Sequence, residues 1–131
     1  MTRKEVVAER LFESKMECLK EEKDCYLYYL LYKFKGKTLV FVNTIGSIKH
    51  VLTMLSLLEV EAWGLHAQME QRQRLKNLDR FRDCENGVLV ATDVAARGLD
   101  IPSVNHIVHY HIPNNPEVQT RTMKMFLLIP F

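Results

Sequence analysis

A chain of 131 residues with 47% apolar and 26% charged side chains can build one hydrophobic core and lacks the composition of a disordered protein. Its first twenty residues are too charged for a signal peptide, and no stretch reaches the roughly 18 apolar residues that would span a bilayer, so we expect an intracellular protein without membrane association. The three cysteines lack metal-ligand spacing, and the net charge of +2 is too small to indicate a polyanionic partner unless basic residues cluster locally.

Apolar and polar residues alternate along the chain in a pattern typical of strands and helices that follow one another. In chain order, we expect a strand at 15–19, a helix at 21–34, a strand at 39–42, a helix at 45–59, a strand at 61–65, a helix at 71–82, and strands at 88–91 and 105–109. The helix at 71–82 has Leu75, Leu78 and Phe81 on its predicted apolar stripe. This alternation predicts right-handed crossovers and a parallel sheet covered by helices.

The segment VATDVAARGLDIP, residues 90–102, places polar side chains directly after a predicted strand. Ligands of parallel α/β sheets bind outside the carboxyl ends of the strands. The hydroxyl of Thr92 and the free N–H groups of the short helix predicted next would suit a phosphate. A purely structural interpretation is also open, with Asp93 as a helix cap, Gly98 as a left-handed residue and Asp100 as a turn former.

Two further predicted strand ends carry polar residues. Asn43 and Thr44 follow one apolar strand, while Gln71 and Arg74, three residues apart on one helical face, follow another. The stretch 66–82 contains five basic and two acidic side chains, an excess of three positive charges. Most of these charges are typical of a solvated helix face. Arg74 differs because it lies near the start of the helix, at the edge where the other polar groups are expected.

Three motifs in this chain resemble, in order and spacing, those of the second RecA-like domain of DEAD-box RNA helicases. LVFVNT is similar to motif IV, the Gln-x-x-Arg of HAQMEQRQR to motif IVa, and ATDVAARGLD to the highly specific motif V. The resemblance covers residues 11–113 and implies a three-layer α/β fold of the P-loop NTPase type, with a parallel sheet. We expect residues 1–10 to be an N-terminal linker and residues 114–131 a divergent tail.

The resemblance also implies roles for individual residues. Four would contact the sugar-phosphate backbone of single-stranded RNA: Thr44, Gln71, Arg74 and Thr92. Three would belong to the ATP side of an interdomain cleft: Asp100 near the ribose, with Arg97 and Gly98 shaping the loop. Contacts to the backbone fix position without reading sequence, so we expect nonspecific, salt-dependent binding. His66 and Trp63 are expected to be structural.

The residues that phosphoryl transfer needs are not found in this sequence. The reaction requires a phosphate cradle, a magnesium carboxylate and a positioned water. The sequence contains neither GxxxxGKS/T nor the DEAD tetrapeptide, and after HIVHYHIP it departs from motif VI, HRxGRxxR, which supplies the arginine finger in the family. We therefore expect no catalytic residue, no metal site and no ATP hydrolysis by this chain alone. ATP and Mg²⁺ would bind only together with a first RecA-like domain.

The tail has two explanations that the sequence leaves open. FLLIPF could serve as the strand that follows motif VI in the family, which indicates that the motif was omitted, or the tail could come from a frameshift. Either way the domain would be truncated, and the lost helix cover predicts an exposed apolar sheet and marginal stability.

Three functions are compatible with these observations. The first is one lobe of an ATP-dependent RNA helicase in RNA remodelling or ribosome biogenesis, since ESKMECLKEEKDCYLYYLL resembles nucleolar helicases of large-subunit assembly. That resemblance implies a nucleolar or nuclear location, with the cytoplasm as the alternative. The second is a catalytically inactive RNA-binding or regulatory module, whose RNA affinity would not respond to ATP. The third is an interaction scaffold. In that case, changing Arg74 or Thr92 would leave the affinity for RNA unchanged.

Overall fold

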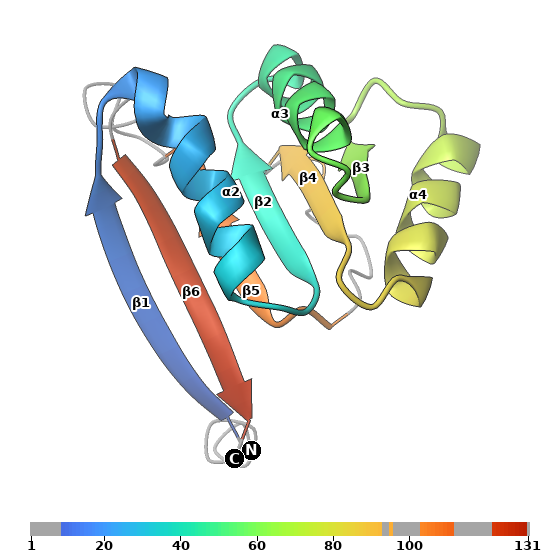
Figure 1. Cartoon of the computed structure of the whole chain (residues 1–131). Coiled ribbons are helices and arrows are strands. Elements are labelled where there is room, and N and C mark those ends of the chain that lie inside the picture. The colour runs from blue at the N-terminus through green and yellow to red at the C-terminus, as the bar shows by residue number, and fades with distance from the viewer. Residues whose placement is uncertain (1–8, 93–94, 96–102, 112–121, 131) are drawn as a thin grey trace.

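The computed structural model describes residues 9–92, 95, 103–111 and 122–130, which form one sheet with helices on both faces (Figure 1). No helix in these ranges is both long enough and apolar enough to cross a membrane. In chain order, the elements are β1 (Glu9–Glu17), the short 3₁₀ helix η1 (Lys20–Glu22), α2 (Lys23–Lys33), β2 (Thr38–Val42), α3 (Ile45–Leu57), β3 (Ala62–Leu65), α4 (Gln71–Asp83), β4 (Val88–Thr92), β5 (His106–His109) and β6 (Thr122–Pro130).

Within the described ranges, the sheet has six strands in the order β1-β6-β5-β2-β4-β3. Strands β5, β2, β4 and β3 pair in parallel, and β6 runs antiparallel to both of its neighbours, β1 and β5. The predicted parallel α/β architecture is therefore confirmed. Because the parallel strands point the same way, their carboxyl ends meet at one edge of the sheet, the upper edge in Figure 1.

Of the two terminal strands, β1 differs from the sequence-based expectation, whereas β6 contains the strand considered for FLLIPF. A strand was expected at 15–19, but β1 begins at Glu9, and the two residues Glu9 and Arg10 pair with β6 although they fall in the predicted linker. The expected strand in FLLIPF exists as part of β6, which starts at Thr122. Charged residues crowd β1, so hydrophobic patterning could not reveal its start. Edge strands tolerate such charges because only one side pairs with a neighbour.

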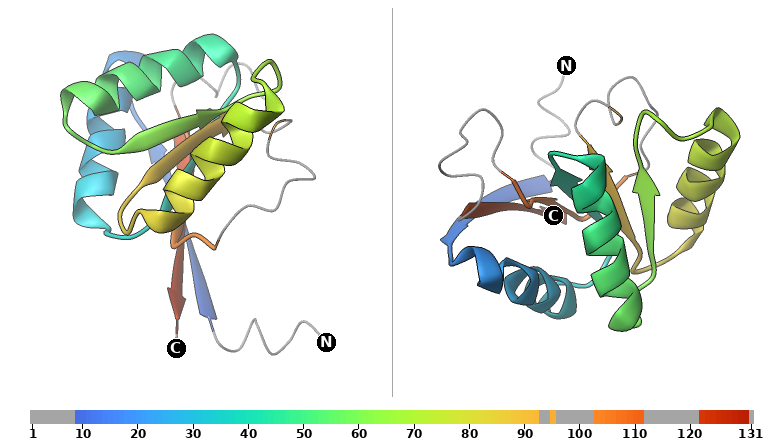
Figure 2. Two further views of the ribbon diagram at one scale, coloured as in Figure 1. Left: turned by 90° about the vertical axis from the view of Figure 1, so that its right-hand side faces the viewer. Right: turned by 90° about the horizontal axis from the view of Figure 1, so that it is seen from above.

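One face of the sheet is covered by α2 and α3, as the view from above in Figure 2 shows. The buried core on this face includes Leu27 and Leu30 of α2, Ile48, Val51 and Leu55 of α3, and the inward side chains of β2, β4 and β5. These helix positions repeat at intervals of three and four residues, which is the spacing of one helical face. Gly64 of β3 permits the close approach of α3, because an added Cβ would lie 3.0 Å from both Ile48 and Leu52.

The opposite face is packed by α4 around a second buried cluster, which contains Leu78, Phe81, Leu39, Leu65 and Leu89. Trp63 packs against this cluster, in agreement with its expected structural role. The predicted stripe was wrong at one position, because Leu75 remains 50% exposed. The inward face of α4 instead contains Asn77, which is buried and bonded to β3.

Candidate nucleic-acid interface

The polar residues predicted to bind RNA follow three neighbouring strand ends. The strand register pairs Val42 at the end of β2 with Thr92 at the end of β4, and Leu65 at the end of β3 with Ala91. Thr44 follows β2 by two residues, and α4 begins a short loop after β3. The first turns of α3 and α4 contain no acidic residue, although the cap of α4, Glu70, places a carboxylate beside the start of that helix. We call this part of the sheet the carboxyl edge.

Thr44 is exposed and caps α3. Its Oγ1 accepts a hydrogen bond of 3.0 Å from the Ser47 backbone N–H and donates one of 2.9 Å to the Ser47 hydroxyl. A threonine at this position satisfies one of the N–H groups that lack a partner within the helix. Thr44 therefore has a structural role in addition to its place at the carboxyl edge, and its hydroxyl can still accept from a second donor.

Gln71 and Arg74 lie together at the start of α4, as their spacing predicted. An Nη of Arg74 donates to Oε1 of Gln71 at 2.6 Å. The Nε of Arg74 is buried and has no hydrogen-bond partner in the described part of the chain. The helix cap Glu70 makes no side-chain hydrogen bond to the helix. This end of α4 thus offers a guanidinium and backbone donors that a phosphate could use.

Asn77 positions α4, and sequence reasoning missed it. Its Nδ2 donates a buried hydrogen bond of 2.8 Å to the Gly64 carbonyl, and its Oδ1 accepts one of 2.8 Å from Gln73. Because both the nitrogen and the oxygen of this buried amide are hydrogen-bonded, Asn77 fixes α4 against β3 without burying an unsatisfied polar atom. One feature of the sequence could have revealed Asn77: it is a polar residue three positions after Arg74, at a point where the apolar stripe of the helix should continue.

Thr92 ends β4 and is half-buried. Its Oγ1 accepts from the Ala95 N–H at 3.4 Å, a long hydrogen bond that leaves the hydroxyl free to donate. The remaining predicted site residues, Arg97, Gly98 and Asp100, lie outside the described residues, as does the alternative helix cap Asp93.

A pocket of about 640 Å³ adjoins Thr44 and brings in residues that the sequence did not single out. The Tyr110 hydroxyl donates to Asp24 at 2.6 Å, and Nε2 of His50 contacts the other Asp24 oxygen at 2.6 Å. The ammonium of the buried Lys23 lies 5.0 Å from the Tyr110 ring centre. Burial and the hydrogen bond to Asp24 raise the pKa of Tyr110, so its hydroxyl stays protonated.

His111 lines the same pocket in its neutral form. Its Nδ1 accepts a hydrogen bond of 3.1 Å from the Asn43 backbone N–H, which leaves no place for a proton on that nitrogen. Burial, with a smaller effect from the positive charge of Lys23, lowers the pKa of His111 to about 4. The described part of the chain contains no group of three or more His, Cys, Asp or Glu residues placed to hold a metal ion. The carboxyl edge therefore presents binding groups and an ordered polar network.

Comparisons with known proteins agree with this geometry. The model of the helicase conserved C-terminal domain matches residues 15–123. The chain is 52% identical over 118 residues to the ATP-dependent RNA helicase ddx24 of Dictyostelium discoideum, and 50% identical over 112 residues to the ATP-dependent RNA helicase mak5 of Schizosaccharomyces pombe. These alignments cover 90% and 86% of the chain, but only 13% and 17% of the two relatives.

A solved structure gives the same assignment at the level of the fold. The C-terminal domain of the DEAD-box protein Dbp5 superposes with a TM-score of 0.68 and 30% identity, covering 78% of this chain and 58% of that one. The expected resemblance to the second domain of DEAD-box helicases is thereby confirmed, as is the RecA-like fold. The chain belongs to the helicase conserved C-terminal domain family, with DEAD-box RNA helicases as its relatives.

Proposed function

We propose that the chain acts as the C-terminal lobe of an ATP-dependent RNA helicase and binds the backbone of single-stranded RNA along the carboxyl edge. One observation carries this proposal: Thr44, Thr92 and the Gln71–Arg74 pair follow three strand ends that the register places side by side. The Thr92 hydroxyl, the Gln71 amide and the Arg74 guanidinium can donate to phosphate and ribose oxygens. The Thr44 hydroxyl, whose hydrogen is donated to Ser47, can accept from a ribose hydroxyl. None of these contacts reads a base.

The nucleotide would bind on the same side of the lobe, between it and a first RecA-like domain. The resemblance of motif V assigns Asp100 to the ribose and Arg97 with Gly98 to the loop around it. A carboxylate can accept hydrogen bonds from ribose hydroxyls. ATP and Mg²⁺ would then be held mainly by the first domain, so the 131-residue chain alone should not hydrolyse ATP. Closure of two such lobes around ATP would hold RNA in a path that a duplex cannot follow.

The direct test is RNA binding by the 131-residue chain, followed through the fluorescence anisotropy of a labelled oligouridine. Arg74→Ala should weaken binding about tenfold and Thr92→Ala about threefold, since charged hydrogen bonds contribute more than neutral ones. Arg74→Ala should also reduce the dependence of log K on log salt by about 0.7, because one positive charge is lost, whereas Thr92→Ala removes no charge and should leave that slope unchanged. Arg80→Ala is the matched control, because it removes one exposed positive charge from the far end of α4.

Two outcomes would contradict the proposal. If Arg74→Ala and Thr92→Ala bind RNA as well as the unchanged chain, the RNA-facing assignment is wrong and a scaffold function is favoured. If a longer protein that includes a first RecA-like domain binds RNA with the same affinity with and without ATP, an inactive RNA-binding module is favoured.

We also propose a nucleolar location and a role in ribosome biogenesis, from the resemblance of residues 13–31 to nucleolar helicases. A fluorescent fusion of the endogenous protein tests this proposal. Signal that excludes the nucleolus would overturn it without affecting the RNA-binding proposal.

A further inference from the structure

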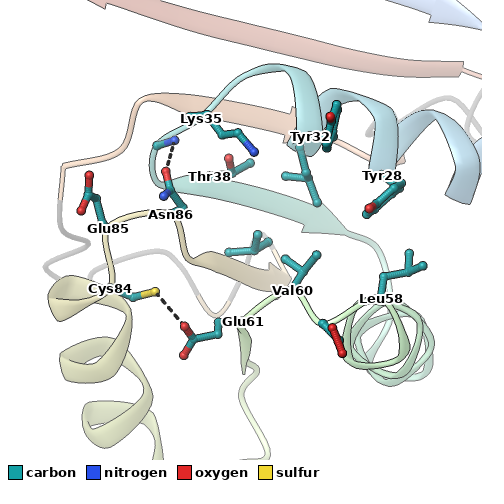
Figure 3. A pocket seen from close by; sticks show the side chains of 14 residues that line it. Tyr28, Tyr32, Lys35, Thr38, Leu58, Val60, Glu61, Cys84, Glu85 and Asn86 are labelled. Carbon is teal, nitrogen blue, oxygen red and sulfur yellow. Dashed lines mark hydrogen bonds between the residues drawn. The ribbon is translucent and has the colours of Figure 1, made fainter.

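A second pocket, of about 430 Å³, lies at the opposite edge of the sheet. It is lined by Thr38 and Val88, the paired first residues of β2 and β4, and by Val60 shortly before β3. Figure 3 labels Thr38 and Val60 among the lining residues. Because parallel strands begin at one edge and end at the other, this amino-edge pocket is separated from the carboxyl edge by the length of the strands. Its volume falls in the range of clefts that hold ligands, about 300–1,000 Å³.

Aromatic and aliphatic side chains form one side of the amino-edge pocket. Tyr28 and Tyr32 of α2 form a tilted pair with ring centres 6.4 Å apart, and Leu58 follows the end of α3 (Figure 3). Tyr32 is 66% exposed and Leu58 is 41% exposed. Tyrosine is enriched at protein interfaces because its ring buries apolar area while its hydroxyl remains hydrated.

Acidic side chains form the other side. Among the described residues, Glu59, Glu61 and Glu85 line the pocket against one basic residue, Lys35, an excess of two negative charges in a chain of net charge +2. The last turn of α3, which ends at this pocket, contains no basic residue to offset the negative end of its dipole. The pocket is therefore complementary to a cation that carries an apolar portion.

The backbone of Glu59 is unusual for a glutamate. Its φ is +60°, in the left-handed region that favours glycine. The Val60 N–H donates to the Leu55 carbonyl and the Glu59 N–H to the Ser56 carbonyl, which is the Schellman arrangement that usually ends in glycine. The sequence thus keeps a carboxylate beside the pocket at a position where glycine would be more stable.

Lys35 shows that the aromatic side of the pocket accepts a cation. Its ammonium lies 4.9 Å from the centre of the Tyr32 ring, within the range of a cation–π contact. A basic side chain from another molecule would compete with Lys35 for that ring and for the nearby carboxylates.

We propose that the amino-edge pocket docks a basic linear segment of a partner protein. An arginine or lysine of the segment would lay its aliphatic stem on Tyr28, Tyr32 and Leu58. Its cation would then reach the three glutamates. Long basic side chains can bury the stem while the charged end remains partly hydrated. Docking at this edge leaves the carboxyl edge free, so the partner could remain bound while the lobe holds RNA.

The test uses the 131-residue chain and two labelled synthetic peptides, one of alternating arginine and leucine and one with glutamine in place of arginine. Fluorescence anisotropy should show that the arginine peptide binds at least tenfold more tightly than the glutamine peptide. Tyr32→Ala should weaken binding of the arginine peptide about threefold. Each lost carboxylate should weaken it about two- to fivefold, as for exposed ion pairs.

Two variants should change affinity in opposite directions. Glu59→Gly should weaken peptide binding while it raises the Tm by a few degrees, because the charge and the backbone strain are removed together. Lys35→Met should strengthen binding about two- to fivefold, because an internal competitor is lost. Asp79→Asn is the matched control, since it removes an exposed carboxylate outside the pocket and should leave the affinity within twofold.

The proposal is overturned if the two peptides bind equally, or if the arginine peptide does not bind at millimolar concentration. It is also overturned if Glu59→Gly and Lys35→Met change the affinity no more than Asp79→Asn does. Backbone amide shifts in NMR spectra add an independent criterion: they should change at Tyr32, Glu61 and Asn86, and changes confined to Asp24 and His111 would place the peptide in the wrong pocket.

Discussion

The two edges of the parallel sheet differ in which ends of the helices they bring together. At the carboxyl edge, α3 and α4 begin, so their N–H groups and Arg74 lie there together with the carboxylates of Glu70 and Asp24. At the amino edge, α2 and α3 end among tyrosines and three glutamates. In our proposals the carboxyl edge binds an anion and the amino edge binds a cation, with the length of the strands between them.

The edges also differ in how the chain turns. At the amino edge, the turn after α2 is held by two asparagine side chains: Asn86 Oδ1 accepts from the Gly36 N–H at 2.8 Å, and Asn105 Oδ1 accepts from the Lys37 N–H at 3.0 Å. At the carboxyl edge, the interactions that order the turns include the Thr44 cap and the Asn43–His111 hydrogen bond. We expect substitutions in the turn after α2 to cost the most stability.

Gly36→Ala should have the largest effect. The φ of Gly36 is +120°, and an added Cβ would lie 2.5 Å from Asn105 Oδ1. Both the backbone and the hydrogen bond from the Lys37 N–H to Asn105 Oδ1 would therefore be strained. We expect a loss of about 3 kcal/mol in the free energy of unfolding, measured by urea denaturation. Gly46→Ala is the control, because its nearest neighbour would be 3.8 Å away and alanine favours the helix. Equal losses in both variants would show that the turn is not specially constrained.

Asn77→Ala should come next, with a loss of about 2 kcal/mol, because the Gly64 carbonyl would lose its buried donor. The same variant should also weaken RNA binding, since α4 would no longer hold Arg74 in place. Urea denaturation and RNA anisotropy on one protein sample check both effects. A destabilised variant that binds RNA normally would mean that Asn77 stabilises the fold without positioning the site.

Acid should weaken the fold through His111. Its folded-state pKa of about 4 lies below the ordinary value of 6.5, so the unfolded chain binds more protons between these two pH values. Stability is therefore present above pH 6.5 and is lost as the pH falls toward 4, by about 2 kcal/mol after allowance for partial exposure. Burial lowers the pKa of His106 as well, which acts in the same direction. The loss between pH 7 and pH 4 should shrink in His111→Gln, and an unchanged pH profile would contradict the assignment.

Thr44→Ala should have the smallest effect, about 1 kcal/mol, through the lost cap of α3. Thr44→Ser should restore the stability, because serine caps equally well. A loss of RNA affinity in Thr44→Ala that Thr44→Ser also reverses would assign the hydroxyl to both roles, whereas unchanged RNA affinity in Thr44→Ala would restrict it to capping.

Much of the central sheet could be predicted from the sequence, because continuous apolar runs such as those in β2 and β4 are typical of strands buried on both faces. The strand starts at Thr38 and Val88 match the prediction within one residue. The start of β1 could not be predicted, since its hydrogen bonds come from β6, far away in the sequence. Leu75 was assigned to the buried face of α4, but the face that packs on the sheet contains the polar Asn77 instead. Hydrophobic patterning could not show this, because Asn77 is buried through its hydrogen bond to the Gly64 carbonyl.

The candidate site could be predicted only in part for the same reason. Its polar residues were found because they follow strand ends and match motifs. The neighbouring network could not be found this way, because Tyr110 reaches Asp24 across 86 positions of the sequence. The buried state of Lys23 likewise depends on the Tyr110 ring that packs over it. Such contacts exist only once β5 lies beside β2.

The most direct test of the central claim is an NMR titration of the isotope-labelled 131-residue chain with oligouridine. We predict that the amide signals of Thr44, Gln71, Arg74 and Thr92 shift, while those of Tyr32, Glu61 and Asn86 stay in place. RNA-induced shifts that cluster at the amino edge, or that spread evenly over both edges, would contradict the assignment of RNA binding to the carboxyl edge.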